Sequence, residues 1–551
     1  MKKRLEGLLQ HALSQAIEGG ALKSTSLPPL LFEVPKNPAF GDLASTVALA
    51  LARAERRPPR QIAEIIRHHV ADPDGVLASV EVDGPGYLNF RFSQKFWSDT
   101  LVALDLPDQT VRFANIGEGK RVQVEFVSAN PTGPLTIGHG RNAVLGDAVA
   151  RLLEATGHQV TREYYFNNAG RQMKLLGESL KARYLELLGE PLTLPEEGYQ
   201  GQYIVDIARA LVDDNGDRLR FEPGSGRFKD AAERAIMADI ERTLDRIDIR
   251  FDVYFNEDTL YRGGQIDEIL AALRARGLAF DRDGAVWLAG EPLGLDKDRV
   301  LVKSSGEPAY RLPDIAYHKN KLARGFDLII DVLGADHIAE HEEVRTAIQA
   351  LGLDADRVKA IIYQFVTLTR GGEQVKMSTR RAEYVTVDEL LDEVGRDVVR
   401  FFFLTRKADS HLEFDLDLAK KQSSDNPVFY VQYAHARICS LLKQAESAGV
   451  QPAAAAQSSL DALTAAEEVA VVKLLARYHD TVEDAARALE PHRVVFYLID
   501  LASEFHRFYN QHRVLTEDRA RTAARLFLAR AVALVICSGL ALVGVSAPET
   551  M

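Results

Sequence analysis

The chain has 551 residues, of which 46% are hydrophobic and 26% charged, and its formal net charge is −12. This length exceeds what one hydrophobic core supports and predicts roughly three or four domains of ordinary soluble composition. The negative charge argues against indiscriminate nucleic-acid binding, although local basic groups can still hold a structured RNA. Cys439 and Cys537 lie in apolar helical patterns without CxxC spacing, which indicates buried thiols rather than a disulfide or metal site.

Residues 1–108 are predicted to form a small α+β domain. Leucines recur at helical spacing over 5–17, and polar residues interrupt them, so this stretch is an amphipathic helix rather than a signal peptide. LLFEVP reads as a short strand, 43–57 as an alanine-rich helix, and SVEVDGPGYLNFRF as strand, turn and strand. No run of the sequence is expected to span a membrane.

The most distinctive stretch, RVQVEFVSANPTGPLTIGHGRN, occupies residues 121–142. Apolar residues alternate with Gln123 and Glu125 at its start, proline and glycine then interrupt it, and a helical pattern begins after Gly140. Such a loop presents backbone N–H groups and a helix N-terminus to a phosphate, and His139 adds a side-chain donor. On these residues alone, nucleotide binding remains one of several interpretations, because strand–loop–helix units with glycines are common.

A parallel sheet is expected to extend from this stretch over residues 109–385. The strand HQVTREYYF follows the helix, which predicts a βαβ crossover. Residues 171–300 carry charged helices and glycine-rich loops and are interpreted as an insertion that interrupts the sheet. The apolar segments FDLIIDVLGADH and KAIIYQFVTLT are predicted to be buried parallel strands.

Four polar clusters fall at predicted strand ends. They are Ser128 to Asn130, Asn167 with Asn168, Asp336 with His337, and KMSTRR at 376–381. Any one of them could be ordinary loop chemistry. Because ligands of doubly wound sheets bind outside the carboxyl ends of the strands, the four together predict one shared site.

From residue 387 onward the chain is predicted to be almost wholly helical. Helices are expected over 416–442, 460–489, 493–510 and 518–542, giving a helical connector at 386–426 and an all-α bundle at 427–551. Tyr430, Tyr433 and Arg437 follow at three- and four-residue steps and so share a helix face. That face is either part of the bundle core or a platform on which splayed RNA bases stack.

Several strings resemble one family. PLTIGHGRN resembles the HIGH motif of class I aminoacyl-tRNA synthetases, SANPTGPLTIGHGRNAVLGD is similar to its arginyl-tRNA synthetase version, and KMSTR resembles the KMSKS loop. PKNPAFGDLA and GPGYLNFRF look like the N-terminal domain of that family, and NPVFYVQYAHARI and GVSAPETM like its anticodon-binding domain. The chain departs from the family pattern at Thr136, Thr379 and Asn168, which replace a histidine, a lysine and an aspartate.

The resemblance implies an α/β fold in which a Rossmann-like parallel-sheet catalytic domain is joined to an α+β N-terminal domain and a C-terminal all-α anticodon-binding bundle. It implies an arginine–tRNA ligase that makes arginyl-adenylate from L-arginine and ATP and transfers arginine to the terminal adenosine of tRNA(Arg). Mg²⁺ would arrive with ATP, no structural metal is expected, and the protein would be a cytoplasmic monomer without membrane contact. Another class I synthetase and a tRNA-binding paralogue without adenylate chemistry are the alternatives.

The resemblance also assigns residues. An arginine substrate needs carboxylates, because a guanidinium pairs with them in planar two-pronged geometry. The implied arginine-binding residues are Glu125, Ser128, Asn130, Tyr310, Asp314 and His337. The implied catalytic residues are His139, Lys376 and Ser378, and the ATP-binding residues are Pro134, Thr136, Gly138, His139, Gly140, Asn142 and Met377. The implied tRNA-binding residues are Asn89, Tyr430, Tyr433, Arg437, Tyr509 and Met551.

Overall fold

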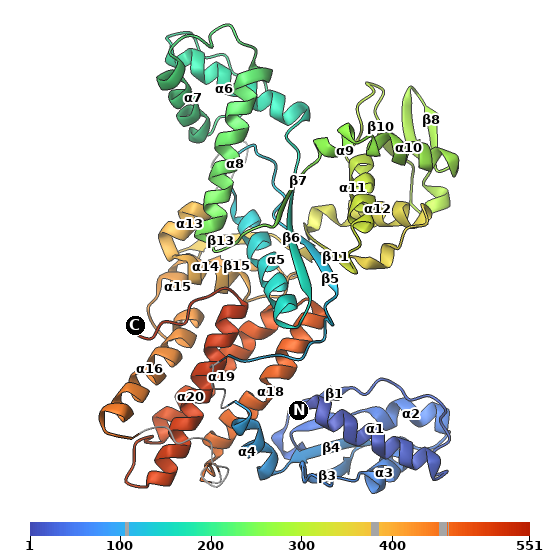
Figure 1. Ribbon diagram of the computed structural model, residues 1–551, viewed down its shortest axis with the longest axis vertical. Helices are drawn as coiled ribbons and strands as arrows, with labels where there is room; N and C mark the ends of the chain where they lie inside the picture. The colour runs from blue at the N-terminus through green and yellow to red at the C-terminus, as the bar shows by residue number, and fades with distance from the viewer. Residues whose placement is uncertain (105–109, 376–384, 451–459, 461) are drawn as a thin grey trace.

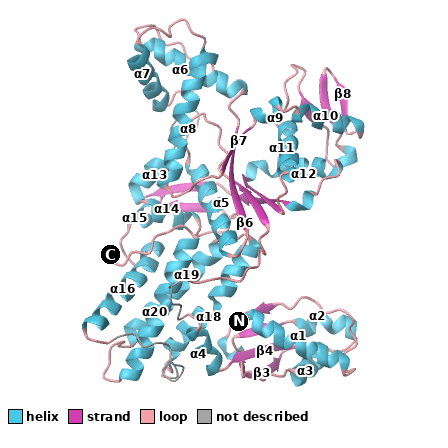
Figure 2. Ribbon diagram, in the orientation of Figure 1, coloured by secondary structure: helices cyan, strands magenta, loops and turns pink. Residues whose placement is uncertain are grey.

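The computed structural model describes residues 1–104, 110–375, 385–450, 460 and 462–551, so the expected residues Lys376, Met377 and Ser378 lie outside it. A parallel sheet stands at the centre of the molecule, and two lobes of helices extend from it to opposite sides (Figure 1). The N-terminal domain and a C-terminal helical bundle lie side by side below the sheet. The strands concentrate in the centre and in the N-terminal domain, whereas the bundle is helical (Figure 2).

The N-terminal domain packs helices on a four-stranded antiparallel sheet of order β1-β2-β4-β3. Leu43–Ser45, expected to begin a helix, is instead strand β2. It pairs with β4, Leu43 opposite Phe90, so tertiary pairing overrides helical propensity here. The elements are α1 (Lys2–Glu18), β1 (Phe32–Glu33), β2, α2 (Val47–Glu55), α3 (Pro59–His69), β3 (Leu77–Asp83), β4 (Tyr87–Phe92) and α4 (Gln94–Val102).

The central sheet has five parallel strands in the order β12-β11-β5-β6-β7. They are β5 (Arg121–Glu125), β6 (Gln159–Phe166), β7 (Val253–Asn256), β11 (Leu328–Gly334) and β12 (Val358–Tyr363). Helix α5 (Ile137–Ala155) connects β5 to β6, as the expected βαβ crossover requires. The expected insertion at 171–300 needs correction, because β7 lies inside it and pairs with β6.

Two lobes therefore replace a single insertion. The first lies between β6 and β7 and contains α6 (Gly170–Leu187), α7 (Gln202–Asn215) and α8 (Lys229–Arg246). The second follows β7 and contains α9 (Asp258–Arg262), α10 (Gln265–Ala275), β8 (Ala279–Arg282), β9 (Ala285–Leu288), β10 (Arg299–Val302) and α11 (Arg311–Ala323). Helix α12 (Ile338–Ala350) then connects β11 to β12 and packs on α11.

KAIIYQFVTLT, expected to be one strand, forms two strands in two sheets. β12 ends at Tyr363, and β13 (Val366–Arg370) pairs with β14 (Glu373–Gln374) and β15 (Leu412–Asp415). The buried Arg141 guanidinium fixes this break, donating to the carbonyl oxygens of Gln364, Lys407 and Ser410 at 2.5, 3.1 and 3.0 Å. Helices α13 (Val387–Val394), α14 (Arg396–Phe403) and α15 (Leu416–Lys420) surround this small sheet.

The C-terminal bundle contains α16 (Pro427–Ser447), α18 (Ala466–Ala488), α19 (His492–Gln511) and α20 (Arg519–Leu542). The helix expected over 416–442 is two helices, because Asn426 caps a new one and accepts from the Val428 N–H at 3.2 Å. Against expectation, α20 is long and apolar enough to cross a membrane by length and composition. Its most apolar window is 67% buried in the bundle, so its hydropathy is that of a core helix.

The central sheet separates two hydrophobic cores. On the α5 face, Val122, Val124 and Ile330 belong to a core that continues into the N-terminal domain and the bundle. On the opposite face, Ile329 and Val358 join a second core made with α10, α11 and α12. Strands β11 and β12 thus contribute to both cores through their alternating side chains.

Gly146, in the middle of α5, is expected to tolerate no side chain. A Cβ added there would lie 2.3 Å from Cγ of Phe126. Gly146→Ala should lower the free energy of unfolding by about 1–3 kcal/mol, despite the better helix propensity of alanine. Urea denaturation measures this, with Gly7→Ala in α1 as the control, since nothing lies within 4 Å of its added Cβ. Equal stability of the two variants would contradict the prediction.

Candidate functional site

Three of the four predicted polar clusters meet at the carboxyl edge of the central sheet. They follow β11, β5 and β6, which are neighbours in the sheet order. Asn130 joins two of them directly, since its Oδ1 accepts from the Asn167 N–H at 3.0 Å. The fourth cluster, at 376–381, lies outside the described residues.

Two adjacent cavities open at this edge. One, of about 780 Å³, is lined by the glycine-rich loop, including Pro134, Thr136 and His139. The other, of about 640 Å³, is lined by Glu257 and Tyr310 among others. Asn130, Gln172 and Glu197 line both, so the two cavities form one continuous site.

The turn after β5 is strained. Val127 and Ser128 have φ of +64° and +44°, a left-handed conformation that is costly for a β-branched residue. The Ser128 hydroxyl donates to Glu125 Oε1 at 2.9 Å and accepts from the Tyr165 N–H at 3.1 Å. Asn142 Oδ1 accepts from the Val127 N–H at 2.6 Å, while its Nδ2 donates to a β11 carbonyl. The Asn142 amide, expected to bind ATP, thus holds the turn.

His139 lies at the N-terminus of α5 with a defined tautomer. The Thr136 N–H donates to its Nδ1 at 3.2 Å, and the Thr136 hydroxyl lies 3.3 Å from the same atom. Burial lowers the pKa of His139, so the ring is neutral near pH 7 and Nε2 carries the proton. Thr136, which replaces a histidine of the motif, therefore orients the histidine that remains.

The rest of the glycine-rich loop packs against the segment that follows residues 376–384. Thr386 forms a β-bridge with Thr136, and the Val387 N–H donates to the Leu135 carbonyl at 2.9 Å. A Cβ on Gly140 would lie 2.9 Å from Val387, whereas the nearest atom to one on Gly138 is 3.8 Å away. Gly140 thus permits close packing, and Gly138 leaves the helix N-terminus open.

Three carboxylates stand in a row across the central sheet. Glu163, Glu125 and Asp331 lie opposite one another in the registers of β6, β5 and β11. Like charges in this position repel, so cations must accompany them. Helix α11 supplies these: Arg324 donates to both oxygens of Glu163 at 2.5 and 2.8 Å, and Lys321 binds Glu125 and Asp331. We call these three acidic residues the carboxylate row.

Lys321 is completely buried and bridges two members of the row. Its Nζ contacts Oε2 of Glu125, lies 2.6 Å from Oδ1 of Asp331 and sits 4.2 Å from the centre of the Tyr317 ring. Burial opposes the charge, but Asp331 and Glu125 raise the pKa of Lys321 to about 12. Lys321 is therefore a permanent internal counter-ion.

The second oxygen of Asp331 faces two histidines. His318 Nε2 lies 2.9 Å and His341 Nε2 3.4 Å from Oδ2, and the three ligand atoms lie within 4.8 Å of one another. This group was not predicted, because its members come from three separate elements, α11, β11 and α12. Lys321 occupies Oδ1 and His318 contacts Oδ2, so the group forms a polar network around Asp331 rather than an open set of metal ligands.

Asp314, in the first turn of α11, differs from the carboxylate row. Its carboxylate has no hydrogen bond or ion pair with any residue that the structure describes. Burial, and then the charges of Glu340, Glu257 and Glu125, raise the pKa of Asp314 well above its ordinary value, while Lys321 acts in the opposite direction. An unmatched carboxyl in an acidic pocket is the group that a cationic ligand would satisfy.

The remaining predicted residues lie at the rim. Tyr310 precedes α11 with 70% of its surface exposed, and His337 Nδ1 lies 3.6 Å from Oε2 of Glu340, a contact that raises the pKa of His337. Asn168 points away from the cavities, where its amide donates to Glu233 at 2.7 Å. An ionised aspartate could not donate this bond.

A second group of predicted residues meets on the bundle. Arg437 lies 4.1 Å from the ring centre of Tyr509 and 5.7 Å from that of Tyr433. His506 lies between Tyr430 and Tyr433, with ring centres 4.6 and 5.8 Å away. Tyr433 is 41% exposed, so this cluster reaches the surface, while Tyr430 and Tyr509 also pack against the bundle core. Met551 is 54% exposed at the end of the tail that follows α20.

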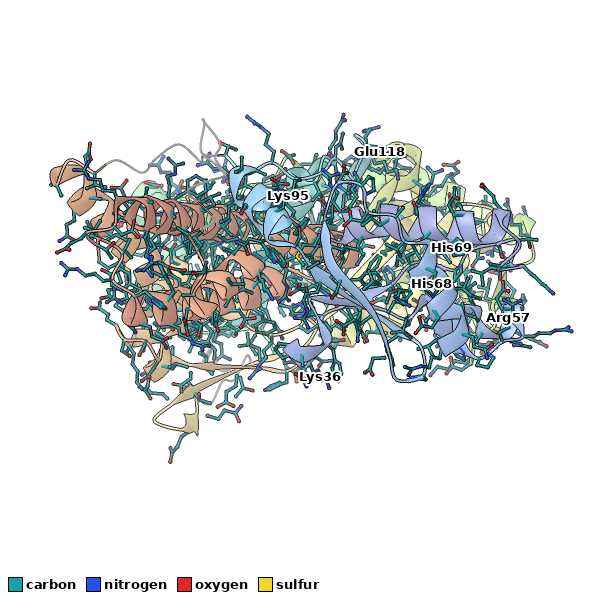
Figure 3. All side chains as sticks on the ribbon, turned by 90° about the horizontal axis from the view of Figure 1, so that it is seen from below. Lys36, Arg57, His68, His69, Lys95 and Glu118 are labelled. Atoms are coloured by element: carbon teal, nitrogen blue, oxygen red, sulfur yellow. The ribbon has the colours of Figure 1, made fainter. Side chains whose placement is uncertain are left out.

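Asn89 is not brought to the surface. It lies in β4 between Ala44 and Glu81 of the neighbouring strands and is 7% exposed. The basic side chains Lys36, His68 and Lys95 instead project from the N-terminal domain in the view from below (Figure 3).

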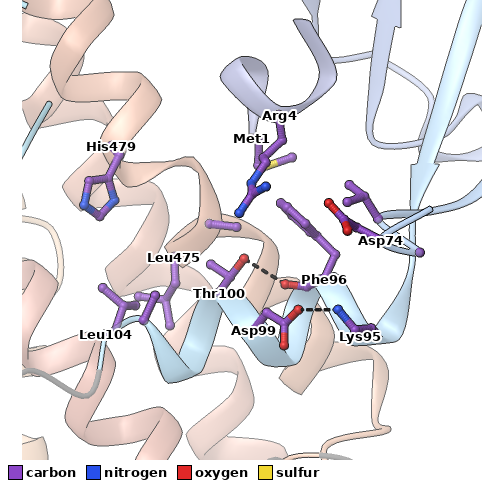
Figure 4. Close-up of a pocket in the computed structure, with 14 residues that line it drawn as sticks. Met1, Arg4, Asp74, Lys95, Phe96, Asp99, Thr100, Leu104, Leu475 and His479 are labelled. Atoms are coloured by element: carbon purple, nitrogen blue, oxygen red, sulfur yellow. Dashed lines mark hydrogen bonds and ion pairs between the residues drawn. The ribbon is translucent and has the colours of Figure 1, made fainter. Parts of the chain in front are cut away.

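A further cavity, of about 490 Å³, lies where the N-terminal domain meets the bundle (Figure 4). Phe96 and Thr100 of α4 line one side, and Leu475 and His479 of α18 the other. It shares no lining residue with the cavities at the sheet edge, so it is part of the junction between the two domains.

Comparisons with known proteins agree along the whole chain. Residues 3–92 match the family model of the arginyl tRNA synthetase N terminal domain, 104–402 that of tRNA synthetases class I (R), catalytic domain, and 431–551 that of the DALR anticodon binding domain. The chain is 49% identical to an arginine–tRNA ligase of Desulfotalea psychrophila, and 46% identical to one of Syntrophotalea carbinolica, each over 100% of both chains.

Solved structures share the fold. The arginyl-tRNA synthetase of Thermus thermophilus aligns with a TM-score of 0.78 at 23% identity, covering 100% of both chains. That of Plasmodium falciparum aligns with a TM-score of 0.77 at 17% identity, covering 100% of this chain and 99% of the other. By its sequence match to the class I catalytic model and by its full-length identity to curated relatives, this chain belongs to the arginyl-tRNA synthetase family.

Proposed function

We propose that this protein ligates arginine to tRNA(Arg), and that the acidic pocket around the unmatched Asp314 selects the amino acid. The arginine carboxylate attacks the α-phosphate of ATP, giving arginyl-adenylate and pyrophosphate. The arginyl group then passes to a hydroxyl of the terminal adenosine of tRNA. The observation that carries the proposal is that the cavity lined by Tyr310 and Pro313, in the segment that leads into Asp314, is continuous with the cavity along the His139 loop.

The guanidinium of arginine is held by Asp314 and Glu125. A planar cation with a fork of donors fits two carboxylates better than a lysine ammonium does. Ser128 fixes one oxygen of Glu125, and Tyr310 covers the rim. Asn130 and His337 bind the α-amino end.

ATP occupies the neighbouring cavity along the glycine-rich loop. The Nε2–H of His139 and the open helix N-terminus at Gly138 donate to phosphate oxygens, with Pro134 shaping the wall. Thr136, Gly140 and Asn142 act by holding the loop. Lys376, with Met377 and Ser378, provides the cation that stabilises the developing charge, and Mg²⁺ enters with ATP and neutralises phosphate charge.

Transfer RNA spans the long face of the molecule. Tyr430, Tyr433, Arg437 and Tyr509 offer stacking surfaces for anticodon bases, with Met551 beside them. Residues 1–108 contact the corner of the tRNA. The buried Asn89 supports this contact indirectly, by holding strand β4 in place. The protein works as a cytoplasmic monomer without a structural metal or membrane contact.

Arginine-dependent ATP–pyrophosphate exchange tests the function, run with and without tRNA. Citrulline and lysine are the controls, because citrulline has the shape of arginine without its charge. Exchange with arginine alone, and discrimination of about 10⁴-fold or more against citrulline, is expected from a site whose carboxylates are left unpaired by the analogue. Binding of tRNA without any exchange would favour the paralogue that lacks adenylate chemistry, and exchange with another amino acid would favour a different class I synthetase.

Arg437→Ala is expected to weaken tRNA binding without affecting amino-acid activation. Loss of one stacking partner costs about 1–3 kcal/mol, so the KM for tRNA in aminoacylation should rise about 5- to 150-fold. The KM values for arginine and ATP should stay unchanged. Arg521→Ala, on an exposed turn of α20, is the matched control. An unchanged KM for tRNA in the Arg437 variant would exclude this face from RNA binding.

A further inference from the structure

We infer that arginine binds by proton exchange: Asp314 carries a proton in the empty pocket, and the entering guanidinium releases that proton to solvent. The inference rests on the proposed function, since it concerns the same pocket. It assigns unequal roles to the two carboxylates. Glu125 is already neutralised within the protein, and Asp314 supplies the charge that only the substrate matches.

Both oxygens of Glu125 are engaged before any substrate arrives. Oε2 contacts the buried Lys321, and Oε1 accepts from the Ser128 hydroxyl at 2.9 Å. Lys321 is itself held from the other side by Asp331 at 2.6 Å. Glu125 is therefore fixed in place as an acceptor that Lys321 already matches, and its remaining lone pairs can receive guanidinium N–H groups.

Asp314 sits nearby without such a partner among the described residues. Lys321 lies seven residues further along the same helix, but its ammonium group already forms ion pairs with Glu125 and Asp331. Arg311, one turn before Asp314, forms an ion pair with Glu343. An ionised Asp314 would thus add an uncompensated charge to an acidic pocket, and a protonated one would not.

The other elements around the pocket add acids rather than cations. β5 presents Glu125, the segment after β7 presents Glu257, and α12 presents Glu340. The facing tyrosines are Tyr165 of β6 and Tyr261 of α9, both bonded to Glu257. His337 also lies near these acids, and it pairs with Glu340 and Asp336. The titratable and charged groups that bear on Asp314 are thus Arg311, Lys321, Glu125, Glu257, Glu340, His337, Tyr165 and Tyr261.

The affinity of the pocket for arginine should therefore depend on pH. Below the pKa of the empty site, binding of the permanently charged guanidinium must expel the proton, so affinity for arginine rises with pH. Above that pKa, Asp314 is already ionised, no proton is released, and affinity levels off. A pocket with two ionised carboxylates at all pH values would show no such dependence.

Isothermal titration calorimetry of the full chain with arginine tests this in buffers that differ in ionisation enthalpy. The slope of observed heat against buffer enthalpy gives the protons released. We expect release of up to about one proton per arginine at the acidic end of the pH range in which the protein is folded, falling toward zero as the pH rises. Binding heat that is independent of buffer throughout this range would overturn the inference and leave the proposed function standing. Absence of arginine binding would overturn both.

A pair of variants on α12 provides the control. Glu340→Gln removes one of the charges that hold the proton on Asp314, so the release profile should shift to lower pH. Glu342→Gln, two residues away with 59% of its side chain exposed, should leave the profile in place. Identical profiles for Glu340→Gln and wild type would show that the released proton does not come from Asp314, which contradicts the inference.

Discussion

Replacing Asp314 with asparagine is expected to lower kcat/KM for arginine in ATP–pyrophosphate exchange by about 10³-fold or more, or about 4 kcal/mol. Asparagine keeps the shape of the side chain and removes its charge. The guanidinium would then enter a pocket in which the charge of Glu125 is already matched by Lys321. Because the substrate makes this contact before and during the reaction, most of the loss should appear in the KM for arginine.

The control for this variant is Glu307→Gln, because Glu307 lines the adjoining cavity together with Pro313 but has 74% of its side chain exposed. A surface charge of this kind contributes little, so its kcat/KM should stay within about threefold of wild type. The KM for ATP should be unchanged in both variants. An Asp314→Asn enzyme with an ordinary KM for arginine would show that the guanidinium binds elsewhere.

Arg400→Ala is expected to cost about 3–5 kcal/mol of folding stability, the range observed when one member of a buried ion pair is removed. Arg400 is completely buried in α14 and donates to three elements at once. It bonds Asp147 of α5 at 2.5 Å, the Ile247 carbonyl after α8 at 2.7 Å and the Val543 carbonyl after α20 at 3.0 Å. Removing it leaves buried carbonyl oxygens without donors at the junction of catalytic sheet and bundle.

Urea denaturation measures this loss, and hydrogen exchange locates it. The amides around Val543 should exchange faster in Arg400→Ala than in wild type. Arg396→Ala, on the same helix with 42% of its side chain exposed, should change stability by no more than about 0.5 kcal/mol. Equal stability of the two variants would mean that Arg400 does not tie the bundle to the sheet.

Local patterns predicted the elements that end in strong turn or capping signals. The GPG turn separates β3 from β4, and the proline and glycine run after β5 marks the loop that carries His139. Elements defined by distant partners were missed. Leu43 has a helical neighbourhood but pairs with Phe90, and the break before β13 is set by Arg141, more than two hundred residues away.

The sequence offered Glu125, Asp314 and His139 as candidate site residues because the chemistry of each side chain suits a cationic amino acid or a phosphate, and because each matches a position of the family pattern. The carboxylate row was not predicted, because it depends on the register of three strands. Two local signals could have indicated it. Asp331 interrupts an otherwise apolar strand, and Asp314, His318 and Lys321 recur at four- and three-residue steps on one face of α11. A polar residue inside a buried strand needs a partner, and that helix face supplies it.

The two hydrophobic cores on either side of the central sheet have a consequence for local unfolding of the protein. One core joins the N-terminal domain, α5 and the bundle, and the other joins α10, α11 and α12. Cooperative opening follows contiguous packing rather than chain order. The helices that hold Asp314 and Lys321 can therefore loosen as one unit while the His139 loop stays with the bundle. The boundary between these units runs through the proposed active site, between the proposed positions of the amino acid and the nucleotide.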